Sequence, residues 1–278
     1  MCGLYGQIDS VNSVLEDLDA EPVDGETSNS LEAKTMRHDS AFGAMSLIVL
    51  DLGEVRRKAI TATLGYRPEW SDKLAMNARA EGNYNKDDDP AYMGEMGIWE
   101  KPYYRDAIKV RRALLPVGYF VEGPKKERLK KPYVVSRKDG EVFTLAAVYC
   151  NYIDEKTGKD VRGFAIVTTA PNSLMDKIGH HRCPVLIRRD DREAWLDPTT
   201  ARVEVDRMMR PWKATGFYAY PVDPRIHPAR YAKRDGKDAS EFMKPIGHPL
   251  FPDDDIDALD DKIWRDIENS APEQGELF

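Results

Sequence analysis

Residues 132–150 read PYVVSRKDGEVFTLAAVYC, two apolar runs on either side of Asp139-Gly140. An Asp-Gly pair between runs rich in valine, phenylalanine and tyrosine is typical of a tight turn, because glycine readily adopts the left-handed backbone that such turns require. The stretch therefore predicts a β-hairpin.

Similar β-prone runs recur along the chain, with short helix-like segments between them. Strands are expected at residues 3–9, 45–50, 58–66, 163–172 and 183–187. Short helices are expected at residues 11–18, 173–181, 191–198 and the start of 102–120, and a short helix or turn at 72–82. Because the helices are unevenly placed and do not alternate with strands, the pattern favours an α+β domain with curled, barrel-like mixed or antiparallel sheets and peripheral helices.

The domain organisation follows from composition. Residues 1–250 of the 278 are expected to form one domain, in which residues 9–40 are an acidic variable insertion that continues as a loop after its first short helix. Residues 251–278 hold ten acidic and two basic side chains. Ile256 and Ile263 belong to a helical spacing, which predicts an acidic surface helix followed by a flexible C-terminal tail.

The formal net charge of −7 is unevenly spread. Residues 101–137 hold eleven basic and three acidic side chains, interleaved with aromatic residues such as Tyr103 and Tyr104. This mixture suits single-stranded nucleic acid, where cations meet phosphates and rings stack on bases. The alternative is a solvated rim whose aromatic side chains face the core.

Cellular location follows from what the sequence lacks. There is no long apolar run of transmembrane type and no signal peptide. The three cysteines, Cys2, Cys150 and Cys183, do not make a disulfide framework. A soluble, cytoplasmic protein is therefore expected.

Cys2 is the strongest single candidate for chemistry. If Met1 is removed, Cys2 carries both a thiol and a free α-amine, with ordinary pKa values of about 8.5 and about 8 that leave both partly reactive at neutral pH. The amine can also act as a base toward its own thiol. The alternative is a small buried residue near the chain terminus.

Asn77 and Arg79 stand two apart, so in an extended segment they share a face. An asparagine amide can orient an amine, and an arginine can hold a phosphate. The alternative is that Asn77 caps a turn and Arg79 makes a surface ion pair.

Glu122 ends the apolar and aromatic run LLPVGYFVE and is followed by Gly123-Pro124. A carboxyl group at such a strand end is a candidate general acid or base with a raised pKa. An ordinary strand-end glutamate is the alternative.

His180, His181, Arg182 and Cys183 stand together between a helix and a strand. Histidine moves protons at neutral pH, and Arg182 is a candidate anchor for a carboxylate or phosphate. A zinc site that also uses Cys150 is an alternative, although the paired-ligand spacing of structural zinc is absent.

The order of these motifs resembles the SRAP (SOS-response-associated peptidase) family, whose members shield abasic sites in single-stranded DNA. The resemblance covers about residues 1–247 and rests on five matching segments. They are Met1-Cys2-Gly3, Leu64–Trp70, Asn77–Glu81, Arg111–Glu122 and Thr168–Pro184. The chain departs from the family pattern at Leu64, Gly123 and Cys183 and has an extra residue, Gly179.

The resemblance implies a set of site residues, no cofactor and no metal. The implied catalytic residues are Cys2, Asn77, Glu122 and His180. The implied DNA-binding residues are Arg67, Trp70, Arg79, Arg111, Arg112 and Arg182. The implied partner is single-stranded DNA with abasic sites, bound by a monomer.

The resemblance also implies a mechanism that needs both nucleophiles of Cys2. The α-amine forms a Schiff base with the aldehyde of the opened sugar, and the thiol then closes a five-membered thiazolidine. Because the second attack is intramolecular, it has a large effective-molarity advantage. Glu122 and His180 are expected to manage the proton transfers, including those of ring reversal.

Two other functions stay open at this point. A class II glutamine amidotransferase also begins with Met-Cys-Gly, but its GHxRWATHG-like segment has no counterpart in the first hundred or so residues. A non-catalytic module that only binds single-stranded DNA is the second alternative.

The C-terminal residues Gln274–Phe278, QGELF, resemble the bacterial sliding-clamp-binding pentapeptide. Such peptides bind through two apolar anchors on a flexible tether. Gln274, Leu277 and Phe278 would make the contacts. The peptide predicts recruitment to a clamp and a bacterial or bacteriophage source, and thus an association with the nucleoid, against the alternative of an arbitrary polar terminus.

Overall fold

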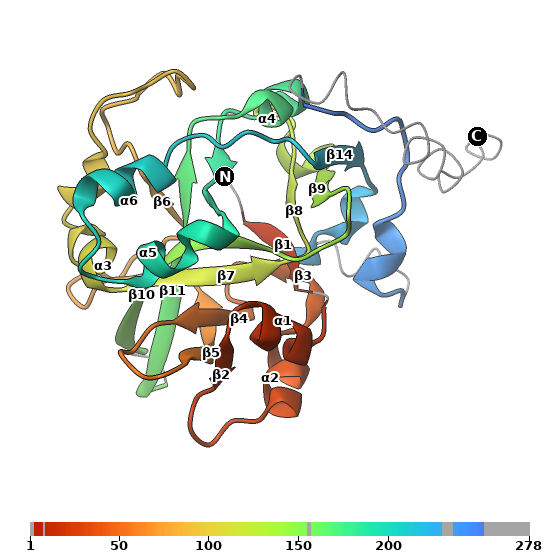
Figure 1. Cartoon of the computed structure of the whole chain (residues 1–278). Helices are drawn as coiled ribbons and strands as arrows, with labels where there is room; N and C mark the ends of the chain where they lie inside the picture. Colours follow the sequence, from red (N-terminus) through yellow and green to blue (C-terminus); the bar gives the residue numbers. More distant parts are fainter. Residues whose placement is uncertain (1–2, 8, 155–156, 230–235, 253–278) are drawn as a thin grey trace.

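The computed structural model describes residues 3–7, 9–154, 157–229 and 236–252 (Figure 1). Cys2, the expected helix around Ile256–Ile267 and the pentapeptide at Gln274–Phe278 lie outside the described residues. Within those ranges, no helix is both long enough and apolar enough to cross a membrane.

A closed five-stranded barrel forms the centre of the molecule. Each strand is hydrogen-bonded to the next around the ring, and β5 closes the ring by pairing in parallel with β11. In ring order the strands are β11 (Lys159–Thr169), β10 (Phe143–Asp154), β7 (Arg112–Val117), β4 (Met45–Leu50) and β5 (Arg57–Leu64).

The closure depends on a close backbone approach at Gly163. The Gly65 amide donates to the Phe164 carbonyl at 3.0 Å. A Cβ atom on residue 163 would lie 2.2 Å from the Gly65 carbonyl oxygen. Because that oxygen belongs to the backbone of the closing segment, only glycine lets β5 and β11 meet.

A second, antiparallel sheet packs against the barrel. Its strand order is β14 (Phe217–Pro221), β9 (Tyr133–Arg137), β8 (Tyr119–Glu122), β1 (Leu4–Gln7) and β3 (Arg37–Ala41). The expected hairpin at residues 132–150 is wrong, because β9 belongs to this sheet and β10 to the barrel. Gly140 does make the tight turn, with φ +75°. The turn passes the chain from one sheet to the other, where β9 pairs with β8 and β14, and β10 with β7 and β11.

Shorter strands extend the barrel sheet at its edges. They are β2 (Ala20–Pro22), β6 (Asn77–Arg79), β12 (Cys183–Pro184) and β13 (Leu186–Ile187). The expected helix or turn at residues 72–82 is wrong at its centre, because β6 is a strand parallel to β11. The Ile166 amide donates to the Met76 carbonyl and the Ala80 amide to the Thr168 carbonyl, each at 2.9 Å, and these bonds hold the segment extended.

Short helices surround the sheets. The α-helices are α1 (Val11–Asp17), α2 (Ser28–Thr35), α3 (Arg105–Val110), α4 (Ser173–Ile178), α5 (Arg192–Leu196) and α6 (Arg202–Met208). The 3-10 helices are η1 (Gly97–Trp99), η2 (Arg128–Lys130), η3 (Arg189–Asp191), η4 (Pro224–Ile226) and η6 (Ala239–Phe242). The loop expected after the first helix is wrong: β2, α2 and β3 follow it. Val11, Val14 and Leu31 are buried in the core, and their burial folds this acidic segment onto the barrel.

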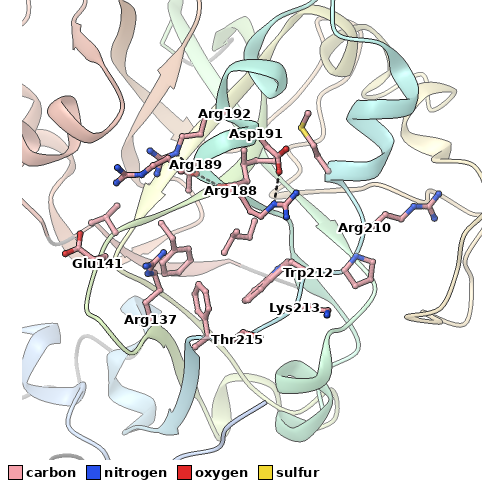
Figure 2. Close-up of a pocket in the computed structure, with 18 of the residues that line it drawn as sticks. Arg137, Glu141, Arg188, Arg189, Asp191, Arg192, Arg210, Trp212, Lys213 and Thr215 are labelled. Carbon is pink, nitrogen blue, oxygen red and sulfur yellow. Dashed lines mark hydrogen bonds and ion pairs between the residues drawn. The ribbon is translucent and has the colours of Figure 1, made fainter. Parts of the chain in front are cut away.

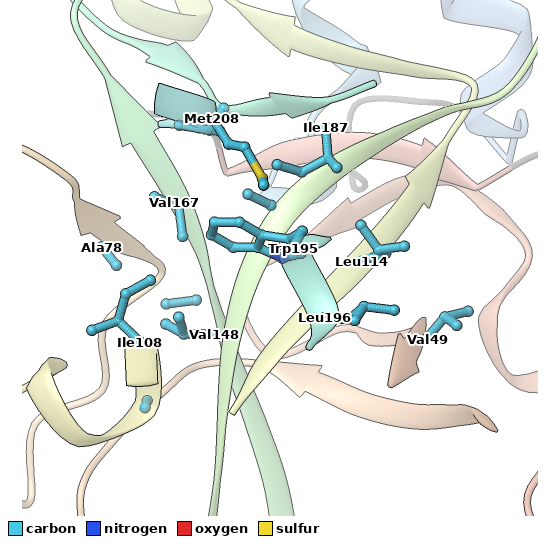
Figure 3. Close-up of a cluster of buried hydrophobic side chains, with 14 of the residues drawn as sticks. Val49, Ala78, Ile108, Leu114, Val148, Val167, Ile187, Trp195, Leu196 and Met208 are labelled. Carbon is cyan, nitrogen blue, oxygen red and sulfur yellow. The ribbon is translucent and has the colours of Figure 1, made fainter. Parts of the chain in front are cut away.

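The core divides along the two faces of the barrel strands. Leu47 and Val49 join the helix-covered cluster, in which Trp195 of α5 is fully buried (Figure 3). The alternate residues, such as Ile48 and Leu50, point to the opposite face with residues of the second sheet. This alternation is the period of two that strands impose. The expected α+β class, with curled barrel-like sheets and peripheral helices, is confirmed.

Candidate active site

Glu122 stands at the end of β8, beside the first strand of the chain. Strands β1 and β8 are antiparallel, with Tyr5 opposite Phe120 and Gly6 opposite Tyr119. The N-terminal end of β1 therefore lies next to the end of β8 that carries Glu122. The second glycine of MCGLYG serves this pairing, because a Cβ on residue 6 would lie 2.3 Å from the Tyr119 ring.

The environment of Glu122 makes its carboxyl group a proton carrier at neutral pH. The residue is only 4% exposed. Burial penalises the carboxylate and raises the pKa of Glu122 from 4.5 to about 7. The side chain therefore exchanges its proton in the range where a general acid or base is most effective.

Gly179 determines how His180 enters the site. Its φ of +79° is left-handed, and it ends α4. The Gly179 amide donates to the Asp176 carbonyl at 2.8 Å, and the His180 amide donates to the Met175 carbonyl at 2.9 Å. This is the Schellman arrangement that glycine favours. The extra residue relative to the family motif is thus the helix cap that turns the chain toward Glu122.

His180 contacts Glu122 in one defined tautomer. Its Nδ1 lies 2.6 Å from the Gly123 carbonyl oxygen, which only accepts, so Nδ1 carries the hydrogen. Its Nε2 then presents a lone pair toward Glu122 Oε2 at 3.4 Å. Burial lowers the pKa of His180 to about 3, so the ring is neutral at pH 7. The pair is therefore a neutral imidazole and a titrating carboxyl group rather than an ion pair.

Asn77 and Arg79 lie on one face of β6, as their spacing predicts, with buried Ala78 between them. Ala78 pairs with Val167 and Arg79 with Thr168 of β11. On the other edge of β11, Thr169 pairs with Cys183. The segments 77–79 and 180–183 are thus brought to the same end of one strand. The Asn77 carbonyl is held by the Tyr104 hydroxyl, which donates at 2.9 Å.

Arg182 lies in a buried ion network, where it anchors two carboxylates of the protein itself. It is 4% exposed, and its Nη2 lies 2.7 Å from Glu81 Oε2 and donates to the Thr168 carbonyl at 2.7 Å. Its Nη1 contacts Asp88 at 3.1 Å. These buried partners hold the guanidinium within the fold, and its expected contact with DNA stays a prediction.

Arg79 shares this ion network but stays at the surface. Its Nη2 lies 2.9 Å from Asp88, and its side chain is 35% exposed. Glu81 and Asp88, the acidic partners, were missed in the sequence reasoning. Glu81 could have been found from the sequence, because it stands two residues after Arg79 in the motif Asn77–Glu81.

Arg112 is also used by the fold. It is 4% exposed, and its Nη1 donates to the Ile108 carbonyl at 2.7 Å. Its other nitrogens donate to the Trp195 and Asp197 carbonyls. Arg112 therefore joins α3 to α5, and its expected role in DNA binding stays a prediction. Arg111, the residue before β7, is half-buried.

Trp70 and Arg67 lie on an aromatic surface. Trp70 is 66% exposed. Its ring packs edge to face with the ring of Tyr103, and the two ring centroids lie 5.7 Å apart. The Arg67 guanidinium lies 4.8 Å from the Tyr152 ring centroid and donates to the Ile153 carbonyl at 2.9 Å. A flat, exposed indole beside a cation suits a base-stacking surface.

A cavity of about 710 Å³ opens beside His180. His181, Asn172 and Trp212 also line it. Asn172 is 7% exposed, and its Oδ1 accepts from the Met175 amide at 3.0 Å. Its Nδ2 is buried and has no partner among the described residues. Neither Asn172 nor Trp212 was predicted, since helix caps and lone tryptophans carry no distinctive sequence signal.

The two cysteines in the described part of the chain are buried. Burial raises the pKa of the Cys150 thiol to about 11 and that of Cys183 further still, so neither thiol ionises at neutral pH. The residues that the structure describes contain no group of three or more His, Cys, Asp and Glu side chains arranged to hold a metal ion.

The fold and the site define a small barrel protein with a buried carboxyl–imidazole pair beside its N-terminal strand. Residues 1–229 match the SOS response associated peptidase (SRAP) family, and the chain belongs to that family. The family match argues against the amidotransferase alternative, because that class of enzyme shares only the opening Met1-Cys2-Gly3 with this chain.

Two curated relatives and one solved structure illustrate the similarity. The abasic site processing proteins YoqW and YobE of Bacillus subtilis are 27% and 25% identical to this chain over 130 residues. Each match covers 46% of this chain and 57% or 58% of the relative, little more than half its length. The fold resembles the crystal structure of a Bacteroides thetaiotaomicron protein, with a TM-score of 0.66 and 20% identity over 81% of this chain and 94% of that one.

Proposed function

We propose that this protein recognises abasic sites in single-stranded DNA and shields them with a covalent thiazolidine link through Cys2, once Met1 has been removed. The names of the curated relatives support the abasic site as the substrate. The observation that carries the chemistry is the buried Glu122–His180 pair next to β1. Cys2 precedes Leu4 by two residues, a reach of at most about 7 Å from the start of that strand.

The first bond forms between the Cys2 nitrogen and C1′ of the opened sugar. The amine lone pair attacks the aldehyde carbon, and a proton moves from nitrogen to the former carbonyl oxygen. Protonated Glu122 then donates its proton to this hydroxyl group, which leaves as water, and the resulting Glu122 carboxylate takes the remaining proton from the nitrogen to give the imine. A pKa of about 7 suits this step, because much of the carboxyl group still holds its proton at neutral pH.

The second bond closes the ring. The Cys2 thiolate adds to the imine carbon, and the nitrogen takes a proton, so one water is lost overall. The Glu122 carboxylate carries the proton from the thiol to the nitrogen, and the neutral Nε2 of His180 accepts a hydrogen bond from the protonated carboxyl group and so orients it. The same groups run the steps in reverse, which makes the link self-reversible.

Other residues position the DNA. Asn77 orients the Cys2 amine, Arg79 and Arg111 contact backbone phosphates, and Trp70 with Arg67 stacks against a flanking base. Arg79 suits its role because its guanidinium is held by Asp88 while the side chain remains partly exposed. A cation that is already held in place positions a phosphate with little loss of entropy.

The deciding experiment is mass spectrometry of the protein incubated with an abasic single-stranded oligonucleotide. The expected product has the mass of protein plus DNA minus one water, and it survives heating. A Cys2→Ser variant keeps the amine but not the thiol, so its product should need borohydride reduction to survive. A wild-type protein that gives no adduct while still binding the DNA would support the non-catalytic alternative.

Exposure of the Cys2 amine is a separate step. Methionine removal or autoprocessing of the N-terminus would supply it, consistent with the peptidase label of the family. An N-terminal extension before Met1 distinguishes the two. If the extension is removed by wild-type protein but not by Glu122→Gln, autoprocessing is supported, and if neither variant removes it, the autoprocessing proposal fails.

Recruitment to a sliding clamp through QGELF is a further part of the proposal. Gln274, Leu277 and Phe278 lie outside the described residues, so its support is the sequence alone. Deletion of residues 274–278 is expected to remove measurable affinity for a bacterial clamp in a pull-down or calorimetric titration. Equal affinity of the full and shortened chains would rule the peptide out.

A further inference from the structure

A second cavity, of about 730 Å³, lies on the side of the barrel between α5, α6 and the segment 211–215 (Figure 2). Its floor is aromatic. Phe143 and Phe217 pack edge to face with centroids 5.1 Å apart, and Trp212 packs against Phe217 at 4.7 Å. The Trp212 Nε1 donates to the Pro184 carbonyl at 2.9 Å, so the indole is fixed and half-buried at the cavity wall.

The rim of this cavity is strongly basic. Seven basic side chains line it against two acidic ones. Arg188 and Arg207 share Asp191, at 2.9 and 2.7 Å. Arg189 and Arg192 share Asp17, whose carboxylate lies 2.8 Å from the Arg192 guanidinium. Pairs of arginines thus share single carboxylates, which leaves an excess of positive charge facing the cavity.

Two further cations have no carboxylate partner in the described part of the chain. Arg210 donates to the carbonyls of Tyr92, Met93 and Gly94 at 2.6, 3.1 and 2.8 Å, and Lys213 is exposed. A neutral carbonyl holds a guanidinium in place without neutralising it. The cavity therefore combines a fixed aromatic ring with an excess of positive charge, and this chemistry is complementary to a base with its phosphate.

The basic cavity adjoins the cavity at His180. Pro211, Trp212 and Lys213 line both, so one wall separates the two spaces. A DNA strand whose abasic sugar lies at the Glu122–His180 pair would have to cross this wall to reach the basic cavity. Its next nucleotides would meet Trp212 first and the arginines beyond it.

We propose that the basic cavity is a subsite for a nucleotide that flanks the abasic site, with its base against Trp212 and its phosphate toward Lys213 and Arg188. This inference rests on the proposed function, since it requires the strand to react at the neighbouring site. The volume of the basic cavity is large enough for a nucleotide, because pockets of roughly 300–1,000 Å³ hold molecules of that size. Single-strand binding proteins use the same combination of ring and cation.

The test compares short and long strands on the full chain. Two short oligonucleotides end at a reduced, unreactive abasic analogue, one at its 5′ side and one at its 3′ side, and each is then extended past the analogue by about four nucleotides. For each protein the readout is the ratio of the two Kd values, measured by fluorescence anisotropy. Wild type should gain at least about tenfold in affinity from the extension on one side only.

The double variant Arg188→Glu/Lys213→Glu should lose most of that gain, so that its ratio falls toward one. Lys159→Glu, an exposed lysine of β11 outside the lining of either cavity, is the matched control and should keep the wild-type ratio. Trp212→Phe retains a ring and should lose only part of the gain, with unchanged far-ultraviolet circular dichroism. The dependence of log Kd on log salt should be shallower by about 0.7 in the double variant, as expected for the loss of one phosphate contact.

Three outcomes would overturn the subsite. They are an equal ratio in wild type and the double variant, no gain from extension in wild type, and competition by inorganic phosphate that leaves the length dependence intact. Failure of the proposed chemistry is recognised separately. A wild type that forms no adduct with a reactive abasic strand, yet shows the length dependence and its loss, would retain the subsite and refute the crosslink.

Discussion

Replacement of Glu122 by glutamine should stabilise the protein at high pH while it removes the acid. In the folded protein the pKa of Glu122 is raised from 4.5 to about 7 by burial. The folded state therefore keeps a proton that the unfolded state releases between these values. Stability from this group is full below pH 4.5, falls as the pH rises toward 7 and is then constant. At about 1.4 kcal/mol per pKa unit, the loss at pH 8 is about 3 kcal/mol.

Glutamine imitates the protonated form, because its amide donates toward His180 Nε2 as the carboxyl proton does. The free energy of unfolding of Glu122→Gln, measured by urea denaturation, should match that of wild type near pH 4.5. It should exceed the wild-type value by about 3 kcal/mol at pH 8. The depressed pKa of His180 also makes stability vary with pH, but it is common to both proteins and cancels in the difference.

The same variant should form the DNA adduct roughly a hundredfold more slowly at pH 7, the usual contribution of a positioned acid. In wild type, adduct formation should decline as the pH rises above 7, because Glu122 loses its proton there. The reasoning is refuted if Glu122→Gln is destabilised equally at pH 4.5 and pH 8, because the buried carboxyl group would then carry no excess proton affinity.

Three further predictions concern the supporting structure. Arg182→Ala should lower the free energy of unfolding by about 3–5 kcal/mol in urea titrations, because it leaves Glu81 buried without its cation; a change below about 1 kcal/mol would contradict this. Gly163→Ala should lower the thermal unfolding midpoint by several degrees, because its Cβ would meet the Gly65 carbonyl, whereas Gly158→Ala, which is strained only by its left-handed φ of +66°, should lower it less. Trp70→Ala should weaken single-stranded DNA binding by about 1–3 kcal/mol in anisotropy titrations and leave the melting curve unchanged, and a lowered melting temperature would show that the ring is structural.

Local sequence was sufficient for most elements and for the order of the site residues. Apolar runs predicted the strands at 45–50 and 58–66, and Asn77 and Arg79 share a strand face because side chains alternate. The Asp139-Gly140 turn was also readable, since glycine supplies the left-handed backbone. The partners of its two arms were not, because a turn reverses the chain without specifying which distant strands it then meets.

The uses of the basic residues depended on the tertiary structure. Arg112 and Arg182 are indistinguishable in sequence from surface arginines, yet both are buried on backbone carbonyls or carboxylates up to about a hundred residues away. Conversely, the cations of the second cavity come from three separate segments that only the packing of α5 and α6 onto the barrel brings together.

The chemistry of the site divides in the same way. The residue types were evident from MCGLYG, Glu122 and His180, because few sequences place an amine, a thiol, a carboxyl group and an imidazole in that order. Their protonation states were decided only by the folded chain. Burial raises the pKa of Glu122, and the Gly123 carbonyl, 57 positions from His180, holds the proton on Nδ1. Solvent exclusion and long-range hydrogen bonds are properties of three-dimensional packing, so no local pattern encodes them.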